Sequence, residues 1–262
     1  MSIFLYTPYK SMIHRLDPRA KIFCLILFFA LGLVFNNPLY LLPILILTLM
    51  IAWLGNSLKN LWNLRYIFLI LIAFSTLLWP FFIRGPTELF SFWRIHFTLE
   101  SILYGFAMGI RTAIFLIAGV TFLSTTRIEE LTTALIKLKL PYPLAFSIST
   151  AFRLLPTFVG AGSTIIQAQT SRGLDLESGN IIVRMKKFIP LLVPILIYAI
   201  RSINLQAMAL ESKCFNLTKD RTFYFRLKMK KSDYVIIFIL FCVCLITLYL
   251  RISGYGAVLP RL

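Results

Sequence analysis

Runs of apolar residues recur along the whole chain, each bounded by charged residues, proline or glycine. A helix that crosses a bilayer needs roughly 20 mostly apolar residues. Five runs meet or approach this requirement: 22–35, 39–54, 66–83, 102–123 and 234–250. The first two are short, so flanking residues must add length. The pattern therefore predicts an all-α polytopic membrane protein with about five transmembrane helices.

Composition supports a membrane protein and limits its partners. Of the 262 residues, 59% are hydrophobic and only 14% are charged, which is too apolar for an average soluble domain. The formal net charge of +17 fits either nucleic acid or the anionic cytoplasmic leaflet of a membrane. For a membrane protein the lipid bilayer is the better explanation, so we expect no nucleic-acid partner.

The distribution of Lys and Arg predicts the orientation in the membrane, because positively charged loops stay in the cytoplasm. Sixteen of these residues lie between Thr125 and Asp233, so we expect that region to be cytoplasmic. The N-terminus is then also cytoplasmic, and Arg15, Arg19 and Lys21 agree. The same reasoning places residues 84–100 and the C-terminus outside.

The long segment between the fourth and fifth spans stays apolar at helical spacing although it is basic. We expect amphipathic helices at 127–139, 156–172 and 194–214. Thr126 with Glu129 predicts a capping box at the start of 127–139. Pro156 is expected in the first turn of 156–172, and Gly173 is expected to end that helix in the left-handed conformation. The resulting division of the chain is 1–124 for the first four spans, 125–232 for the cytoplasmic helices and 233–262 for the last span.

The chain offers few groups for catalysis or metal binding. His14 and His96 are far apart in sequence, and no glycine-rich phosphate loop precedes a lysine. We predict no catalytic residues, no metal, no cofactor and no enzymatic activity, so a partner must hydrolyse any ATP. Arg111 lies inside the fourth span, where a structural hydrogen bond or a direct functional role remain open. We interpret the four cysteines as small core residues: Cys24, Cys214, Cys242 and Cys244.

Two short stretches have a local physical explanation. Asp17 caps a helix whose first residue is Pro18. Arg172, followed by Gly173, places a planar guanidinium at a helix end, where it suits a carboxylate-lined groove. The alternative is an arginine that merely complements the helix dipole.

Several motifs together resemble the T component of energy-coupling factor transporters. They are the stretches at 14–21, 140–141, 151–156, 168–173 and 209–211, with sequences HRLDPRAK, LP, AFRLLP, AQTSRG and ALE. The resemblance covers nearly the whole chain, in order. It implies that Ser171, Arg172 and Gly173 form a first coupling motif, whose arginine reaches into a groove on one of two ATPase subunits.

The resemblance places a second coupling motif at Ser212, Lys213 and Cys214, with Gln169, Glu211 and Arg153 in supporting roles. Here the sequence departs from the pattern of a small residue followed by Arg-Gly. Lys213 keeps the charge but loses the bidentate fork, and Cys214 loses the easy left-handed cap of glycine. We therefore expect a second contact that is weaker or differently built.

The implied function is mechanical coupling in the bacterial cytoplasmic (inner) membrane. Two ABC ATPase subunits would move the coupling helices, which would reorient a separate substrate-binding S component for the uptake of a vitamin or a metal ion. An ordinary ABC permease that forms the substrate pathway itself remains the main alternative. A membrane enzyme or scaffold has no motif in its favour.

Overall fold

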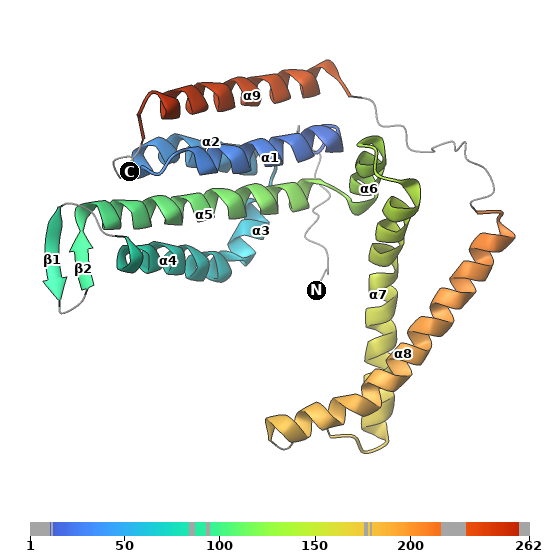
Figure 1. Ribbon diagram of the computed structural model, residues 1–262. Helices are drawn as coiled ribbons and strands as arrows, with labels where there is room; N and C mark the ends of the chain where they lie inside the picture. Colours follow the sequence, from blue (N-terminus) through green and yellow to red (C-terminus); the bar gives the residue numbers. More distant parts are fainter. Residues whose placement is uncertain are drawn as a thin grey trace. The chain divides into compact units, whose positions relative to one another are not determined.

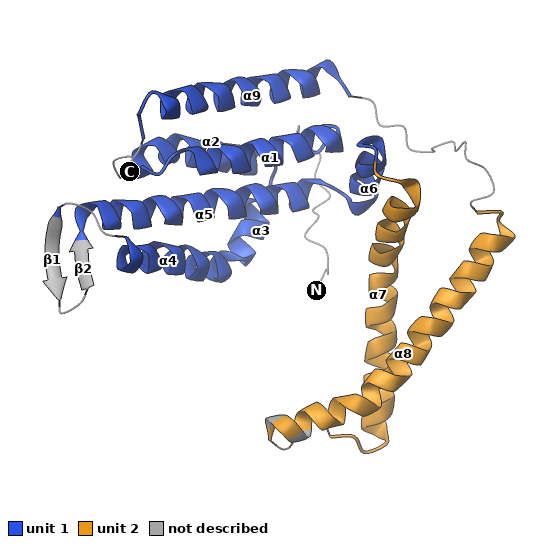
Figure 2. Ribbon diagram, viewed as in Figure 1, with its two compact units in different colours: residues 1–139, 227–262 blue, residues 140–226 orange. Residues whose placement is uncertain are grey.

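The computed structural model describes residues 11, 13–83, 87–92, 95–175, 178, 180–215 and 229–256. The chain forms two compact units, residues 1–139 with 227–262 and residues 140–226 (Figure 2). The functional division at 124/125 and 232/233 stays a prediction. Some cations of the basic segment lie outside the described residues: Lys219, Arg221, Arg226 and Lys228.

The fold is built from α-helices, as predicted (Figure 1). Unit 2 holds α7 (Tyr142–Ser171) and α8 (Ile181–Ser212). A short antiparallel pair of strands lies in the connection before α5, with Ser91 opposite His96. The elements of unit 1 are α1 (Pro18–Val34), α2 (Pro38–Leu54), α3 (Leu58–Asn63), α4 (Arg65–Phe82), β1 (Glu88–Phe92), β2 (Ile95–Thr98), α5 (Leu99–Thr125), α6 (Ile128–Lys137) and α9 (Lys231–Ile252).

Each of the five predicted spans coincides with a helix, but length and composition select a different set of five. The helices α4, α5 and α9 are long and apolar enough to cross a membrane, and so are α7 and most of α8. In contrast, α1 and α2 have 17 residues each and extend about 25 Å, less than the ~30 Å hydrocarbon core. Span length alone therefore does not assign the helices to the membrane.

The start of α1 confirms the predicted cap. The Oδ1 atom of Asp17 accepts a hydrogen bond from the backbone N–H of Arg19 at 3.0 Å, and Pro18 is the first helical residue. Proline has no N–H to leave unsatisfied at this position. The boundary of the first apolar helix thus follows from local chemistry.

One predicted capping box and two predicted helix starts in the basic segment are wrong. The capping residue of α6 is Arg127, and the hydroxyl of Thr126 is buried without a hydrogen-bond partner, so no capping box forms. Pro156 lies inside α7 and Pro194 inside α8, because both helices begin earlier than predicted. A proline removes one helical N–H, and the helix continues when the residues on both sides favour it.

The centre of unit 1 is α5, which contacts α4, α2 and α1, while α9 packs on α1 (Figure 1). The buried cluster combines side chains from four of these helices. Its fully buried members include Leu31 of α1, Leu41 of α2 and Ile114 of α5, with Leu240 of α9 nearly buried. The most deeply packed side chains therefore lie where α1, α2 and α5 meet.

Close backbone approach joins α4 and α5. A Cβ atom at Gly105 would lie 2.7 Å from the carbonyl oxygen of Thr76, so the site admits only glycine without a shift of the backbone. About two turns further on, the hydroxyl of Thr112 lies 3.0 Å from that of Ser75. Small residues and hydroxyl pairs are typical of helix packing in membranes.

Arg111 of α5 binds the end of α1, which confirms a structural hydrogen bond. Its Nε atom donates to the Gly32 carbonyl oxygen at 2.8 Å, and its Nη2 donates to the Phe35 carbonyl at 2.7 Å and to Asn36 Oδ1 at 2.8 Å. The last carbonyls of a helix have no partner within the helix. Arg111 therefore satisfies the end of α1 and ties the α1–α2 turn to α5.

We predict that Arg111→Leu lowers the stability of the chain by about 2–4 kcal/mol, because it leaves these acceptors without a charged donor. The measurement is the thermal unfolding midpoint in detergent. Arg65→Leu is the matched control, since Arg65 is exposed, stacks on Trp62 and Tyr66 and donates one hydrogen bond to the Tyr66 hydroxyl at 2.9 Å. Equal shifts for the two variants would show that the Arg111 contacts contribute little.

Candidate functional site

The first candidate motif forms the end of α7. The backbone N–H groups of Arg172 and Leu174 both donate to the Gln169 carbonyl, at 3.1 and 3.0 Å, and that of Gly173 donates to Thr170 at 2.9 Å. Gly173 has φ +90°, the left-handed conformation. This is the Schellman arrangement, in which a left-handed residue lets the last N–H groups reach back to free carbonyls.

The second candidate motif forms the end of α8 with the same bonds. The N–H groups of Lys213 and Phe215 donate to the Leu210 carbonyl, at 3.2 and 3.0 Å, and that of Cys214 donates to Glu211 at 2.9 Å. Each motif thus has a cation one residue before the left-handed position. The two helix ends are built alike although their sequences differ.

Cys214 corrects the expectation that the cap is lost. It adopts φ +56° and takes the place that Gly173 has in α7. A residue with a Cβ atom costs about 1–2 kcal/mol in this conformation. The thiol is also exposed, so Cys214 is not a core residue. The second motif therefore keeps the shape of the first at an energetic cost.

The two cations are exposed to solvent, and in the described part of the chain neither has a carboxylate within salt-bridge distance. The serine hydroxyls before them donate back to their own helices, Ser171 to the Gln167 carbonyl and Ser212 to the Ala209 carbonyl, both at 3.0 Å. Each motif can consequently offer an acceptor group one exposed cation that has no carboxylate partner among the described residues.

The supporting residues are placed less uniformly. Gln169 is half-buried and its carbonyl accepts two of the cap bonds, whereas Glu211 and Arg153 are exposed. Arg153 lies within α7, about five turns before Arg172. It is therefore remote from the first motif, and nothing in the structure gives it a direct contact there.

Aromatic packing holds the second motif at the beginning of α7. The ring of Phe215 lies 4.5 Å from that of Phe146 and 6.1 Å from that of Tyr142, measured between centroids. Further along, Phe158 of α7 meets Tyr198 of α8 edge to face at 6.2 Å. Sequence reasoning missed these anchors. The available signal was an apolar residue directly after the cap, where a hydrophobic contact often accompanies the Schellman arrangement.

This packing separates the two motifs. Arg172 follows the end of α7 and Lys213 lies near its start, beside Phe215. At 1.5 Å per residue the stretch from Phe146 to Arg172 extends about 40 Å. The structure therefore does not bring the candidate residues into one site but places them at two distant helix ends of a single unit.

We predict opposite effects for two substitutions at the caps. Gly173→Ala should weaken its cap by about 1 kcal/mol, and Cys214→Gly should strengthen its cap by a similar amount. Amide hydrogen exchange of Leu174 and Phe215 reports each cap directly and should change about fivefold.

Gly160→Ala provides the control for Gly173→Ala. Gly160 also has open space around its Cβ position, but it lies inside α7 with ordinary helical geometry. Alanine should therefore stabilise the helix there. Slower exchange in all three variants would contradict a special backbone requirement at Gly173.

Comparison with known proteins agrees with the motifs. The family model CbiQ, described as cobalt transport protein, matches residues 9–224. The energy-coupling factor transporter transmembrane protein EcfT of Staphylococcus aureus (strain 04-02981) is 34% identical over 261 residues, which cover 95% of this chain and 96% of that protein.

Two further proteins of that name are similar over most of their length. The protein of Acidaminococcus fermentans is 31% identical over 87% of this chain and 88% of its own length. That of Thermosediminibacter oceani is 32% identical over 89% of this chain and 91% of its own length. The helices that can cross a membrane fit such proteins. The chain therefore belongs to the CbiQ family, as a T component of energy-coupling factor transporters, and is a multi-pass protein of the bacterial inner membrane.

Proposed function

We propose that this chain couples two ABC ATPase subunits to a separate substrate-binding membrane subunit and is itself not catalytic. The observation that carries the proposal is the pair of matching helix ends. Each presents one exposed cation that has no carboxylate partner among the described residues, and the two lie about 40 Å apart along α7. Two separated contacts of the same construction suit two similar partner subunits.

The proposal assigns unit 2 to the cytoplasm even though α7 and α8 are long enough to span a membrane. Arg153 and Arg201 are exposed in the middle parts of these helices. An arginine facing lipid near the bilayer centre costs about 2.5–3.5 kcal/mol or more. The abundance of Lys and Arg in this segment supports the same side of the membrane.

The five transmembrane helices are then α1, α2, α4, α5 and α9. Although α1 and α2 are short, they pack in the core of unit 1, and Leu31 and Leu41 are fully buried there. Thinning of the bilayer or extension by flanking residues compensates for a mismatch of a few ångströms. This assignment retains the five-span topology with the N-terminus inside.

The two cations would serve the contacts differently. The planar guanidinium of Arg172 can hold a carboxylate with two parallel hydrogen bonds, which fixes orientation. The ammonium of Lys213 is a point charge and holds an acceptor without fixing its plane. We infer that movement of the ATPases changes the spacing of the two contacts, and that α7 and α8 follow.

The apolar surface of α8 suits the substrate-binding subunit. Ile189, Leu192 and Val193 are each more than half exposed, next to the basic residues Lys186 and Lys187. Such a surface needs a cover of lipid or protein. The proposed substrates are vitamins or metal ions. The description of the matching family names cobalt, and the substrate itself is chosen by the other subunit.

We predict that Arg172→Ala reduces the number of co-purified ATPase subunits by at least tenfold, because a charge-assisted contact contributes roughly 1.5–3 kcal/mol. The measurement is a gentle-detergent pull-down of the tagged chain. Lys213→Ala should have a smaller effect, and Arg172→Lys an intermediate one.

Arg201→Ala is the matched control, since Arg201 is exposed on α8 and away from both caps. It should retain both ATPases. Loss of ATPases in this variant alone, or none with the wild type, would contradict the coupling role. Binding of substrate by the isolated chain would favour a permease that forms the pathway itself.

A further inference from the structure

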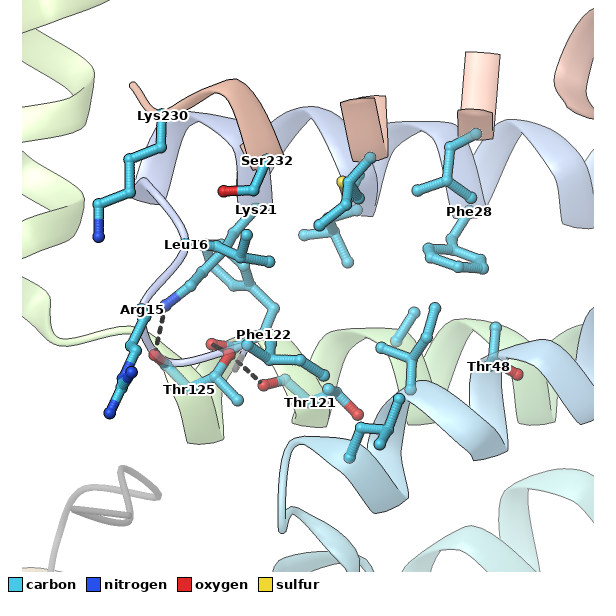
Figure 3. A pocket seen from close by; sticks show the side chains of 18 residues that line it. Arg15, Leu16, Lys21, Phe28, Thr48, Thr121, Phe122, Thr125, Lys230 and Ser232 are labelled. Atoms are coloured by element: carbon cyan, nitrogen blue, oxygen red, sulfur yellow. Dashed lines mark hydrogen bonds between the residues drawn. The ribbon is translucent and has the colours of Figure 1, made fainter. Parts of the chain in front are cut away.

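Unit 1 contains a cavity that the coupling proposal does not use. It has a volume of about 510 Å³ and lies between α1, α2, α5 and α9 (Figure 3). Pockets of roughly 300–1,000 Å³ are typical of bound small molecules. The cavity is therefore large enough for part of a ligand.

The body of the cavity is apolar. Its walls include Leu25 and Phe28 of α1, Ile51 of α2, Ala118 and Phe122 of α5, and Ile236 of α9. All four helices belong to the same unit, and α9 contacts α1 in preference to α5. The space between α9 and the α2–α5 pair is consequently left for an apolar occupant.

One end of the cavity is cationic. Arg15, Lys21 and Lys230 gather there with Ser232, while Phe28 and Thr48 lie toward the other end (Figure 3). No carboxylate is among the residues that line the cavity in the described part of the chain. The ligand that fits is apolar over most of its length and carries a negative group at one end.

The three cations are not equally available. The ammonium of Lys21 is buried and donates to the Thr125 carbonyl at 2.7 Å and to the His14 carbonyl at 3.4 Å. Asp17, Asp233 and Glu130 act on it electrostatically. Arg15 and Lys230 are exposed and remain for the ligand.

Each of the two buried acids near this end is engaged with the backbone through one carboxylate oxygen, whereas Asp17 Oδ2 and Asp233 Oδ1 have no hydrogen-bond partner in the described part of the chain. Asp17 accepts from the Arg19 N–H at 3.0 Å, and Asp233 accepts from the Lys230 N–H at 2.7 Å. Both carboxylates are nearly inaccessible, 5% and 1% exposed. Because both acids are buried, the exposed charged side chains that line this end of the cavity are Arg15 and Lys230.

We propose that this cavity binds an anionic phospholipid, with an acyl chain between α9 and α5 and the phosphate at Arg15 and Lys230. The cationic end includes the starts of α1 and α9, which the charge distribution places on the cytoplasmic side. The cytoplasmic leaflet supplies anionic lipids. The proposal does not depend on the coupling function.

The test is native mass spectrometry of the purified full-length chain with phosphatidylglycerol and with phosphatidylcholine of the same acyl chains. Phosphatidylglycerol should bind more tightly. Arg15→Ala and Lys230→Ala should each weaken its binding about fivefold, as expected for one basic residue near a lipid surface. Lys231→Ala is the control, because Lys231 is adjacent and exposed but does not line the cavity.

A second pair of variants tests the apolar body. Ala118→Leu places a larger side chain in the cavity wall and should abolish binding of both lipids. Gly119→Leu adds its side chain in the same turn of α5, where the space around the Cβ position is open, and should bind as the wild type does. An unchanged unfolding midpoint without lipid shows that each variant is folded.

Three results would overturn the proposal. The first is equal binding of the two lipids, and the second is a loss of lipid binding in Lys231→Ala as large as that in Arg15→Ala and Lys230→Ala. The third is unchanged lipid binding in Ala118→Leu. Displacement of the lipid by millimolar inorganic phosphate would also count against it, because the site would then recognise a phosphate without its acyl chain.

Discussion

The contact of Arg111 with the end of α1 is the interaction on which the arrangement of unit 1 depends. Within a membrane, free carbonyl groups cannot turn to water and must find partners in the protein. Arg111 donates one hydrogen bond to the end of α1 and two to the α1–α2 turn, and the N–H of Asn36 in the same turn donates to the Gly256 carbonyl at 3.2 Å. One turn thereby joins α5 and the residues after α9.

The two units use their side chains differently. In unit 1 the helices bury a shared cluster and satisfy polar groups such as Ser57, whose hydroxyl lies 3.1 Å from that of Thr121. In unit 2 only Ala145 and Leu191 are buried among the described side chains. Such a helix pair gains little from its own packing and depends on partners for further stability. This contrast suits a body fixed in the membrane and a second part that partners can move.

The sequence predicted those features that local chemistry determines. Asp17 with Pro18, and Gly173, fix helix ends through their own backbone preferences, and the apolar runs located the helices of unit 1. The starts of α7 and α8 could not be predicted in this way, because Pro156 and Pro194 resemble helix starts until the residues before them are also seen to be helical. Cys214 is the opposite case. Its intrinsic preference opposes the left-handed conformation, and only the packing of Phe215 on Phe146 explains why the chain turns there.

The prolines inside α8 also affect how that helix carries a load. Pro190 and Pro194 lack the N–H groups that would bond the carbonyls of Lys186 and of Pro190 itself, so two bonds are missing one turn apart. Beyond its first turn, α7 lacks only one such helical hydrogen bond, at Pro156. Bending stiffness falls where helical hydrogen bonds are absent. A force applied at Arg172 therefore acts on a comparatively stiff helix, α7. A force applied at Lys213 acts on α8, which bends more easily, at a point closer to its start than to its end.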